Sequence, residues 1–336
     1  MSLGQPIAGS ARPMRRMSIT QEVVVAIAAL ILFLLFSVTL DNFLSSSNLI
    51  TLVRNVSVLG MLSLGMGLVV IGRGVDLSLV AIMAVSMTFT IVLANGGWPF
   101  SLALVAGLLF AICVGAVTGF LVAYVEIPSI FATLAISAIV YGLGRGVIAD
   151  LDVNNLPPDL GWFVWLGRGS LFGIPVAIWV FAAMSLVLHL YLKKTGLGRF
   201  SYAIGDNLAT ARITGIPARP VIVLKYVLAA VTAFAAGAVT AASVASMNMR
   251  IVNSTMIYDV LLVVVLGGIG LTGGRGGVRN VLVGTVLIGL LLNAMTILDI
   301  SYTVQNLVKS AVLLAALVVD ALLNPRDEQT SQQGDI

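Results

Sequence analysis

The chain has 336 residues, of which 59% are hydrophobic and 10% charged, and its mean hydropathy is +1.09. Because a soluble globular domain carries roughly 25% charged residues, this chain has too few polar side chains to cover a surface in water. Its formal net charge of +4 is too small to indicate nucleic-acid binding. Its single cysteine, Cys113, excludes a disulfide framework and a cysteine-based metal site. We therefore expect an all-α polytopic protein of the lipid bilayer.

Apolar segments recur along the whole chain at the length of membrane helices. At about 20 residues per crossing, they predict about ten helices. These cover residues 19–40, 50–72, 76–95, 99–125, 129–148, 173–192, 220–245, 257–271, 278–298 and 303–323. Segments 129–148 and 257–271 are either full spans or re-entrant, broken helices. We expect a single transmembrane domain over residues 19–323, with cytoplasmic tails at 1–18 and 324–336.

Positive charges are distributed unevenly between the two sides that these helices define. If the N-terminus is cytoplasmic, most of the 18 Lys and Arg residues also lie in the cytoplasm. The exceptions are Arg54, Arg145, Arg168, Arg250 and Lys309. This asymmetry agrees with the positive-inside rule and places residues 149–172 outside. Arg145, Asp259 and Lys309 lie near expected outer helix ends, so we expect their side chains to reach water.

Two breaks between expected helices are rich in glycine. The turn residues are Gly72, Gly74, Asp76 and Ser78 in the first break and Gly273, Gly274 and Gly276 in the second. Glycine permits a sharp turn, and Asp76 and Ser78 are residue types that cap a following helix. A charged residue near a membrane segment can also belong to a transport pathway. Asp76 is therefore either a capping residue of the turn or a residue of the pathway.

Residues 193–220 form the one long polar and basic stretch that still has a helix-forming composition. A helical core over residues 208–213 is bracketed by Gly205 on one side and by Gly215 and Pro217 on the other. Such residues mark helix ends. Because loops between membrane helices are usually short, this stretch indicates a surface that a soluble cytoplasmic partner contacts.

The sequence lacks the motifs of two enzyme classes. It contains no Gly-Lys pair and hence no P-loop, so we expect no ATP hydrolysis by this chain alone. Its one histidine, His189, excludes the two-histidine helix of zinc proteases. We expect a non-catalytic chain that binds no cofactor or metal itself.

Several motifs occur in a fixed order between residues 45 and 323. They are Val-Ile-Gly-Arg-Gly-Val-Asp-Leu-Ser (70–78), Ile-Pro-Ser-Ile-Phe-Ala-Thr-Leu (127–134), Tyr-Ala-Ile-Gly-Asp-Asn (202–207) with Ala-Arg-Ile-Thr-Gly-Ile (211–216), Tyr-Asp (258–259) before Leu-Gly-Gly (266–268), and Gly-Gly-Arg-Gly-Gly (273–277). In this combination the chain resembles the permease subunits of bacterial ABC sugar importers of the ribose, xylose, arabinose and galactose type.

The resemblance implies the architecture of a complete importer. It implies a homodimer or a pair of related permeases in the bacterial inner membrane, cytoplasmic ATPase subunits that use ATP and Mg²⁺, and a periplasmic sugar-binding protein. In these permeases the segment matching residues 205–215 is the coupling helix, which docks on the ATPase. The resemblance assigns this role to Gly205, Asp206, Asn207, Ala211, Arg212 and Gly215. The family commonly has Pro-Glu at the positions of Leu208 and Ala209, which implies that one contact with the ATPase differs here.

Polar residues within or beside the expected helices are candidates for lining a sugar pathway. They are Asn55, Thr133, Ser137, Tyr141, Asn248 and Asn293. Thr133, Ser137 and Tyr141 fall on one helical face and form the strongest candidates. The hydroxyls of Thr133 and Ser137 can equally bond to carbonyls of their own helix.

Two other functions are compatible with the residues. One is an ABC permease for branched-chain amino acids or nucleosides, which shares the general architecture. The other is an ion-coupled secondary transporter, for which we expect a carboxylate in the middle of a span. Asp76, Glu126, Asp259 and Asp299 all lie near expected helix ends, which argues against ion coupling.

Overall fold

The computed structural model describes residues 21–323. The tails predicted to be cytoplasmic, residues 1–18 and 324–336, lie outside the described residues. Within the described part, each of the expected apolar segments is helical. Seven helices are long and apolar enough to cross a membrane, and three further apolar helices accompany them. The prediction of an all-α polytopic membrane protein is therefore confirmed.

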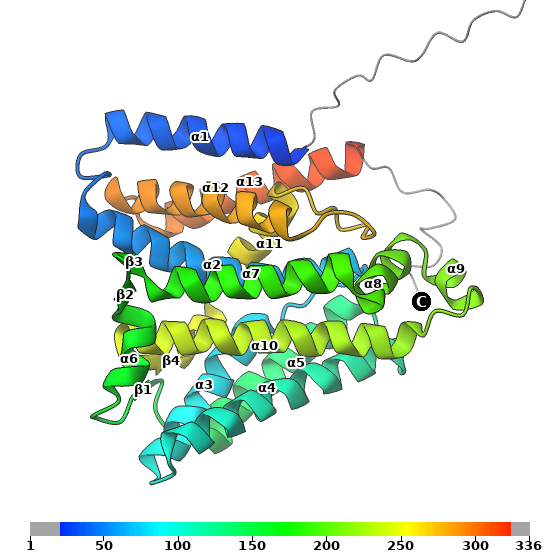
Figure 1. Cartoon of the computed structure of the whole chain (residues 1–336), viewed down its shortest axis with the longest axis horizontal. Coiled ribbons are helices and arrows are strands. Elements are labelled where there is room, and N and C mark those ends of the chain that lie inside the picture. Colours follow the sequence, from blue (N-terminus) through cyan, green and yellow to red (C-terminus); the bar gives the residue numbers. More distant parts are fainter. Residues whose placement is uncertain (1–20, 324–336) are drawn as a thin grey trace, which may run out of the picture.

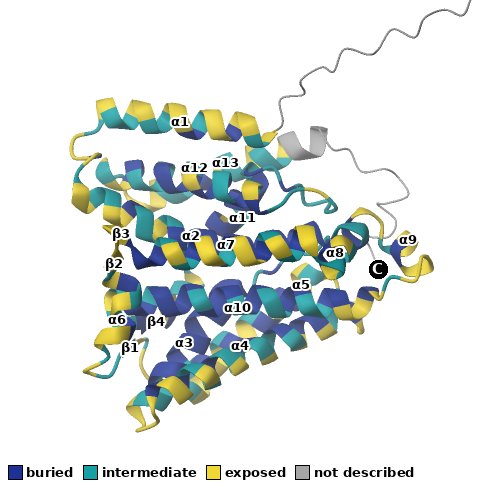
Figure 2. Ribbon diagram, viewed as in Figure 1, coloured by how far each residue is buried: buried dark blue, intermediate teal, exposed yellow. Residues whose placement is uncertain are grey.

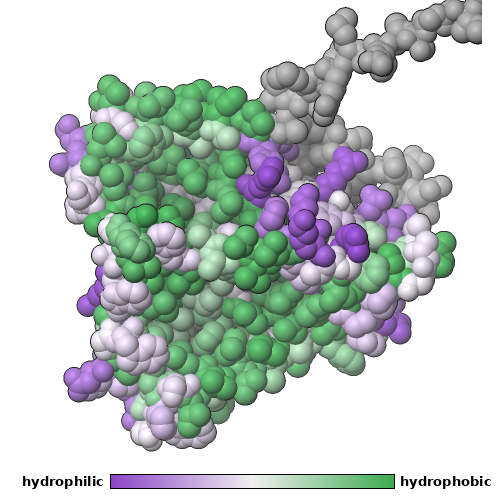
Figure 3. Space-filling view, in the orientation of Figure 1, coloured by the Kyte–Doolittle hydropathy of each residue, from purple (hydrophilic) through white to green (hydrophobic). Residues whose placement is uncertain are grey.

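The apolar helices lie side by side along the length of the molecule (Figure 1). The seven long ones are α1 (Gln21–Thr39), α2 (Ser46–Ile71), α4 (Phe100–Ala123), α5 (Ser129–Leu143) with its π-helical continuation η1 (Gly144–Ile148), α7 (Val176–Lys194), α10 (Ala218–Val244) and α12 (Val278–Ile297). The others are α3 (Leu79–Asn95), α11 (Met256–Leu266) and α13 (Tyr302–Leu323). Hydrophobic residues cover the middle of the molecule, and hydrophilic residues gather toward its two ends (Figure 3).

The remaining elements lie at the two ends of this bundle. The end that carries α8 (Gly196–Asp206) and α9 (Leu208–Ile213) is named the α9 end. The opposite α6 end carries β1 (Val153–Asn155), α6 (Gly161–Arg168), β2 (Ser170–Leu171), β3 (Ile174–Pro175) and β4 (Ser246–Asn248). β1 pairs antiparallel with β4, and β2 pairs antiparallel with β3. Residues 149–172, predicted to form one external element, thus lie together at the α6 end.

The core of the bundle is formed by α2, α3 and α10, which are the most deeply buried helices (Figure 2). Every residue of α2 from Leu59 to Ile71 is buried. Small residues allow the neighbouring helices to approach: a Cβ at Gly119 of α4 would lie 2.7 Å from the Cα of Val223 in α10. In lipid such close backbone contact holds helices together, because apolar burial alone does not.

The chain between α10 and α11 is not a continuous helix. After α10 it forms β4 and then a 3-10 helix, η2 (Met249–Asn253), which packs against α3. α11 has 11 residues, or about 16 Å at 1.5 Å per residue, about half the thickness of a hydrocarbon core. Segment 257–271 is therefore a broken helix and not a full span. Segment 129–148 is instead a continuous helix that is long enough to span.

Candidate coupling site

The segment predicted to contact a partner forms two short helices joined by one extended residue. The Thr195 hydroxyl accepts a hydrogen bond from the Gly198 N–H at 3.0 Å and begins α8. Asn207 leaves the helical conformation, and its side-chain oxygen accepts from the Thr210 N–H at 2.8 Å, which begins α9. Such caps satisfy amide groups that have no partner within the helix. Beyond α9 the chain turns at Gly215, whose φ is +82°. The helical core expected over 208–213 is confirmed.

One side of α9 is buried and the other is open. Ala211 is 3% exposed, whereas Ile213 is 85% exposed. A single exposed apolar side chain is common on protein surfaces, so Ile213 marks the open side of α9 and does not by itself identify a partner. Next to α9, a shallow cleft of ≈ 390 Å³ is lined by Tyr124, Arg212, Ile216, Pro217, Ala218, Arg219 and Pro220. The α9 end therefore offers a projecting helix and an adjoining cleft to a partner.

The end of α8 lies directly against both glycine-rich turns. A Cβ at Gly205 would lie 2.0 Å from the Ile71 carbonyl oxygen and 2.5 Å from the Gly274 nitrogen. The Gly274 N–H donates to that same oxygen at 2.9 Å. Gly274 has a φ of +74°, which a residue with a Cβ adopts only with strain. We name this contact of residues 71–73, 205–206 and 273–274 the glycine junction. It has no room for larger residues and joins α8 rigidly to the end of α2.

Two further hydrogen bonds hold the glycine junction in place. The Tyr202 hydroxyl of α8 donates to the Gly276 carbonyl oxygen at 2.9 Å, and burial raises the pKa of this phenol, so it remains a donor. On the other side, Lys225 Nζ of α10 donates to the Gly72 carbonyl oxygen at 3.0 Å. Lys225 is 1% exposed, which is rare for a lysine. The α8–α9 segment is thereby connected to both α2 and α10.

The first glycine-rich turn continues from the junction toward α5. Asp76 Oδ1 accepts hydrogen bonds from the N–H and the hydroxyl of Ser78. Of the two residues expected to cap α3, Ser78 makes no side-chain capping bond, whereas the Asp76 carboxylate accepts the N–H of Ser78 directly before that helix. The Val75 N–H donates to the Ser129 hydroxyl at 3.1 Å. The turn therefore links the glycine junction to the first residue of α5.

An ion pair joins α9 to the same end of α5. Arg212 Nη2 lies 3.0 Å from Glu126 Oε1, and Arg219 Nη2 lies 3.6 Å from that oxygen. Glu126 lies between α4 and α5 with a φ of 63°, which costs a non-glycine residue free energy. The side chains are about half exposed, so the pair contributes at most about 1 kcal/mol. Sequence reasoning missed this partner, and the contact of Arg212 with an ATPase stays a prediction.

The residues predicted to line a sugar pathway do not form one lining within a single chain. The Thr133 hydroxyl is buried and donates to the carbonyl oxygens of Val75 and Ile130 at 3.4 and 3.3 Å. Ser137 is half-buried, and the Tyr141 hydroxyl accepts from Asn253 Nδ2 at 3.1 Å. The polar face of α5 that carries Thr133, Ser137 and Tyr141 thus contacts the 72–78 turn at one end and the region of η2 at the other.

The three asparagines of that set lie elsewhere. Asn293 of α12 and Asn48 of α2 exchange side-chain hydrogen bonds at 2.8 and 3.1 Å. Asn248 is exposed in β4 and accepts from the Arg250 N–H at 2.9 Å, and Asn55 is exposed on α2. Because Asn293 uses its amide to join two helices, its arrangement fits packing better than substrate contact. The pathway assignment of all these residues stays a prediction.

Two charged residues expected to reach water are instead buried. Lys309 Nζ of α13 lies 2.9 Å from Asp259 Oδ1 of α11, and the two residues are 6% and 9% exposed. Arg145, the third of that group, lies 3.2 Å from Asp152 at the α6 end. A lysine within an apolar helix was the signal that could have revealed the buried pair.

Comparison with known proteins identifies the kind of molecule to which this arrangement belongs. Residues 48–317 match the protein family described as "Branched-chain amino acid transport system / permease component". This chain belongs to that permease family. The permease has relatives along nearly its whole length, and the resemblance inferred from the motifs is confirmed.

Three relatives show how far the similarity extends. The permease is 30% identical to the ribose import permease protein RbsC of Escherichia coli strain K12 over 300 residues, which cover 88% of this chain and 92% of the relative. It is 32% identical to RbsC of Bacillus subtilis strain 168, covering 86% and 89% of the two chains. It is 31% identical to the L-arabinose transport system permease protein AraH of Escherichia coli, covering 86% and 87%. The permease is thus a multi-pass, non-catalytic transport subunit.

Proposed function

We propose that the permease is the translocation subunit of an ATP-driven importer for a pentose or hexose. The observation that carries this proposal is the full-length similarity to permeases named for ribose and L-arabinose. In the proposed assembly, two copies or a paralogous pair form the pathway in the bacterial inner membrane. A periplasmic sugar-binding protein delivers the sugar, and cytoplasmic ATPase subunits bind ATP and Mg²⁺.

The distribution of charge supports an orientation with the α9 end in the cytoplasm. Arg54 and Arg168 hydrogen-bond to carbonyl oxygens of Arg168 and Ser243 near α6, and Arg145 and Arg250 both pair with Asp152 there. Four of the five basic residues that the topology placed outside therefore lie at the α6 end, whereas most of the 18 Lys and Arg residues lie elsewhere. Since an excess of positive charge marks the cytoplasmic side, the α6 end, which has the smaller share, is assigned to the periplasm. The N-terminus is then cytoplasmic, as the charge pattern predicts.

The proposed coupling runs from α9 through rigid contacts into the bundle. An ATPase that pushes on α9 displaces α8, and the glycine junction transmits that displacement to the ends of α2 and α12. The ion pair between Arg212 and Glu126 offers a second route to α5. Closely packed elements move as units instead of deforming, which suits them to carry such a movement.

Reconstituted transport tests the proposal directly. The permease, its ATPase and its binding protein in liposomes are expected to accumulate labelled ribose or L-arabinose only when ATP is present. The purified permease alone is expected to hydrolyse no ATP, since the sequence has no P-loop. ATP hydrolysis by the isolated chain would contradict the assignment, as would sugar accumulation that follows a proton or sodium gradient.

A cysteine at the exposed position Asp206 tests the orientation. With Cys113 replaced by serine, an impermeant thiol reagent added to spheroplasts should not label Asp206→Cys, whereas the same reagent should label it in inverted vesicles. Labelling from the periplasmic side would reverse the assigned orientation.

One observation favours a second substrate class. The description of the matching family names branched-chain amino acids. Competition for uptake separates the two: excess ribose or L-arabinose displaces a sugar substrate, whereas excess leucine displaces an amino-acid substrate. Inhibition by leucine without inhibition by either sugar would favour the amino-acid importer.

A further inference from the structure

The buried pair of Asp259 and Lys309 belongs to a polar network that the coupling site does not use. Lys309 Nζ donates to Asp259 Oδ2 at 3.0 Å and to the Thr255 hydroxyl oxygen at 3.1 Å. The Thr255 hydroxyl donates to Asn306 Oδ1 at 2.9 Å and lies 3.2 Å from the Tyr302 hydroxyl. These bonds stabilise a charge that an apolar environment would otherwise disfavour.

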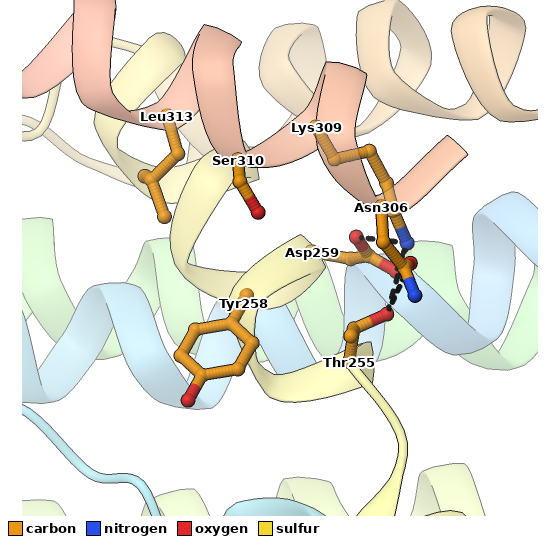
Figure 4. A pocket seen from close by; sticks show the side chains of 7 residues that line it. All are labelled: Thr255, Tyr258, Asp259, Asn306, Lys309, Ser310 and Leu313. Carbon is orange, nitrogen blue, oxygen red and sulfur yellow. Dashed lines mark hydrogen bonds and ion pairs between the residues drawn. The ribbon is translucent and has the colours of Figure 1, made fainter. Parts of the chain in front are cut away.

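The network opens on one side into a small recess between α11 and α13. Figure 4 shows Asn306, Lys309 and Ser310 of α13 facing Asp259 of α11, whereas the ring of Tyr258, which also borders the recess, extends from α11 away from α13. The recess has a volume of ≈ 10 Å³, which is about the space that one water molecule occupies. Ser310 and Tyr258 border it and are exposed, Tyr258 by 55%. Hydroxyl, amide and aromatic groups, together with the apolar side chain of Leu313, thus line a recess beside the ion pair of Asp259 and Lys309.

The recess lies at a depth where lipid is a poor neighbour for these groups. Lys309 follows Tyr302, the first residue of α13, by seven positions, or about 10 Å along the helix from the α6 end. Ionisable residues at such depth almost always face a bundle interior or a water-filled cavity. A single chain leaves the recess open, so water or another polar molecule is expected in front of it.

The outward face of α5 has the opposite character. Its large exposed residues are apolar, with exposed fractions between 44% and 68%: Ile130, Phe131, Leu134, Ile139 and Leu143. The polar residue at the start of the predicted stripe, Thr133, is turned into the protein and bonded to carbonyls. The recess between α11 and α13 exposes the hydroxyl-bearing Ser310, which lies on α13 between Leu307 and Leu314, themselves 70% and 65% exposed.

We propose that this recess is a subsite of the sugar pathway, where a passing monosaccharide contacts Tyr258, Asn306 and Ser310 beside the Asp259–Lys309 pair. The inference rests on the proposed function as a sugar importer. Hydroxyl and amide groups exchange hydrogen bonds with sugar hydroxyls, and an aromatic ring covers the apolar face of a sugar ring. The recess is too small to enclose a sugar, so it offers a weak, wet contact that does not trap the substrate.

Cysteine accessibility in the assembled transporter tests this subsite. In a Cys113→Ser background, Ser310→Cys is compared with Leu109→Cys, which replaces an exposed apolar residue of α4. A hydrophilic thiosulfonate reacts with the thiolate, which forms in water and not in lipid, so position 310 is expected to react about tenfold faster or more. Ribose or L-arabinose at twice its half-saturating concentration should slow that reaction about threefold.

Each other outcome overturns the subsite. Equally slow reaction at positions 310 and 109 would place the recess in lipid or against a second copy of the chain. Fast labelling at position 310 that sugar does not slow would show that the recess is reached by water but not by the substrate. Uptake by the Cys113→Ser parent is measured in parallel: its failure would refute the sugar importer, whereas the ratio of labelling rates still decides whether the recess is reached from water.

A variant pair at Tyr258 provides a second readout. The side chain is exposed, so neither Tyr258→Phe nor Tyr258→Leu should affect folding. We expect Tyr258→Leu to raise the KM for uptake roughly threefold through loss of the ring, and Tyr258→Phe to raise it less. A KM unchanged in both variants would remove Tyr258 from the subsite.

Discussion

Substitution of Gly205 by alanine probes whether the glycine junction carries the coupling movement. The added Cβ would lie 2.0 Å from the Ile71 carbonyl oxygen and 2.5 Å from the Gly274 nitrogen, both backbone atoms. The end of α8 must therefore move away from α2, and the 2.9 Å hydrogen bond between Gly274 and Ile71 is lost or lengthened. Gly196 begins the same helix, and a Cβ added there would meet no atom within 4 Å, so Gly196→Ala serves as the matched control.

The structure sets the size of the effect. Overpacking a tight contact costs about 1–3 kcal/mol, and a lost hydrogen bond costs a further 0.5–1.5 kcal/mol or so. The better helix propensity of alanine returns about 1 kcal/mol. The net cost is about 1–3 kcal/mol, which corresponds to a roughly 5- to 150-fold shift away from the packed junction. Gly196→Ala gains the same helix propensity, and its added Cβ contacts no other atom.

The assay is ATP-driven uptake in vesicles that contain equal amounts of each variant. Gly205→Ala is expected to lower uptake at least about fivefold while the ATPase still binds and still hydrolyses ATP, and Gly196→Ala is expected to match the wild type. Normal uptake by Gly205→Ala at equal membrane level would refute the role of the glycine junction. Equal losses in both variants would assign the defect to α8 as a whole.

Three other perturbations test the neighbouring contacts. Arg212→Glu repels Glu126 and should impair uptake, and adding Glu126→Arg should restore it if the pair inside the chain matters; if Arg212 serves only an ATPase surface, the double variant stays impaired. Asn207→Ala removes the cap of α9 at a cost of about 1 kcal/mol and should weaken ATPase binding about fivefold, measured by co-purification, whereas Asn207→Asp keeps an acceptor and should bind normally. Asn293→Leu leaves Asn48 without its amide partner and should lower thermal stability without changing the KM for sugar; a raised KM at unchanged stability would return Asn293 to the pathway.

The sequence was sufficient to find the membrane helices and the short helix α9. Runs such as residues 100–123 and 218–244 are apolar for long enough that only a helix satisfies their backbone in lipid. The cap residue Asn207 and the turn at Gly215 mark the limits of α9 by local chemistry, so its position was predictable too. These features depend on neighbours within a few residues.

The contacts that define the site depend on distant parts of the chain. Glu126 and Arg212 are 86 positions apart, and Asn48 and Asn293 are 245 positions apart. No periodicity in one segment specifies such a partner. The glycine junction was equally hidden, because each glycine is explained locally as a turn or a helix end, and only the fold shows that Gly205 and Gly274 meet.

The short length of α11 has a consequence for how the protein enters the membrane during synthesis. Its 11 residues are too few to be inserted as an independent span of about 20 residues, and an unpaired Asp259 adds a further cost of up to about 3 kcal/mol within the bilayer. Its stabilising partner, Lys309, is translated 50 residues later. The stretch from α10 to α13 must therefore integrate as one unit after α13 leaves the ribosome, and a chain that ends after α12 is expected to be degraded before it forms a smaller permease.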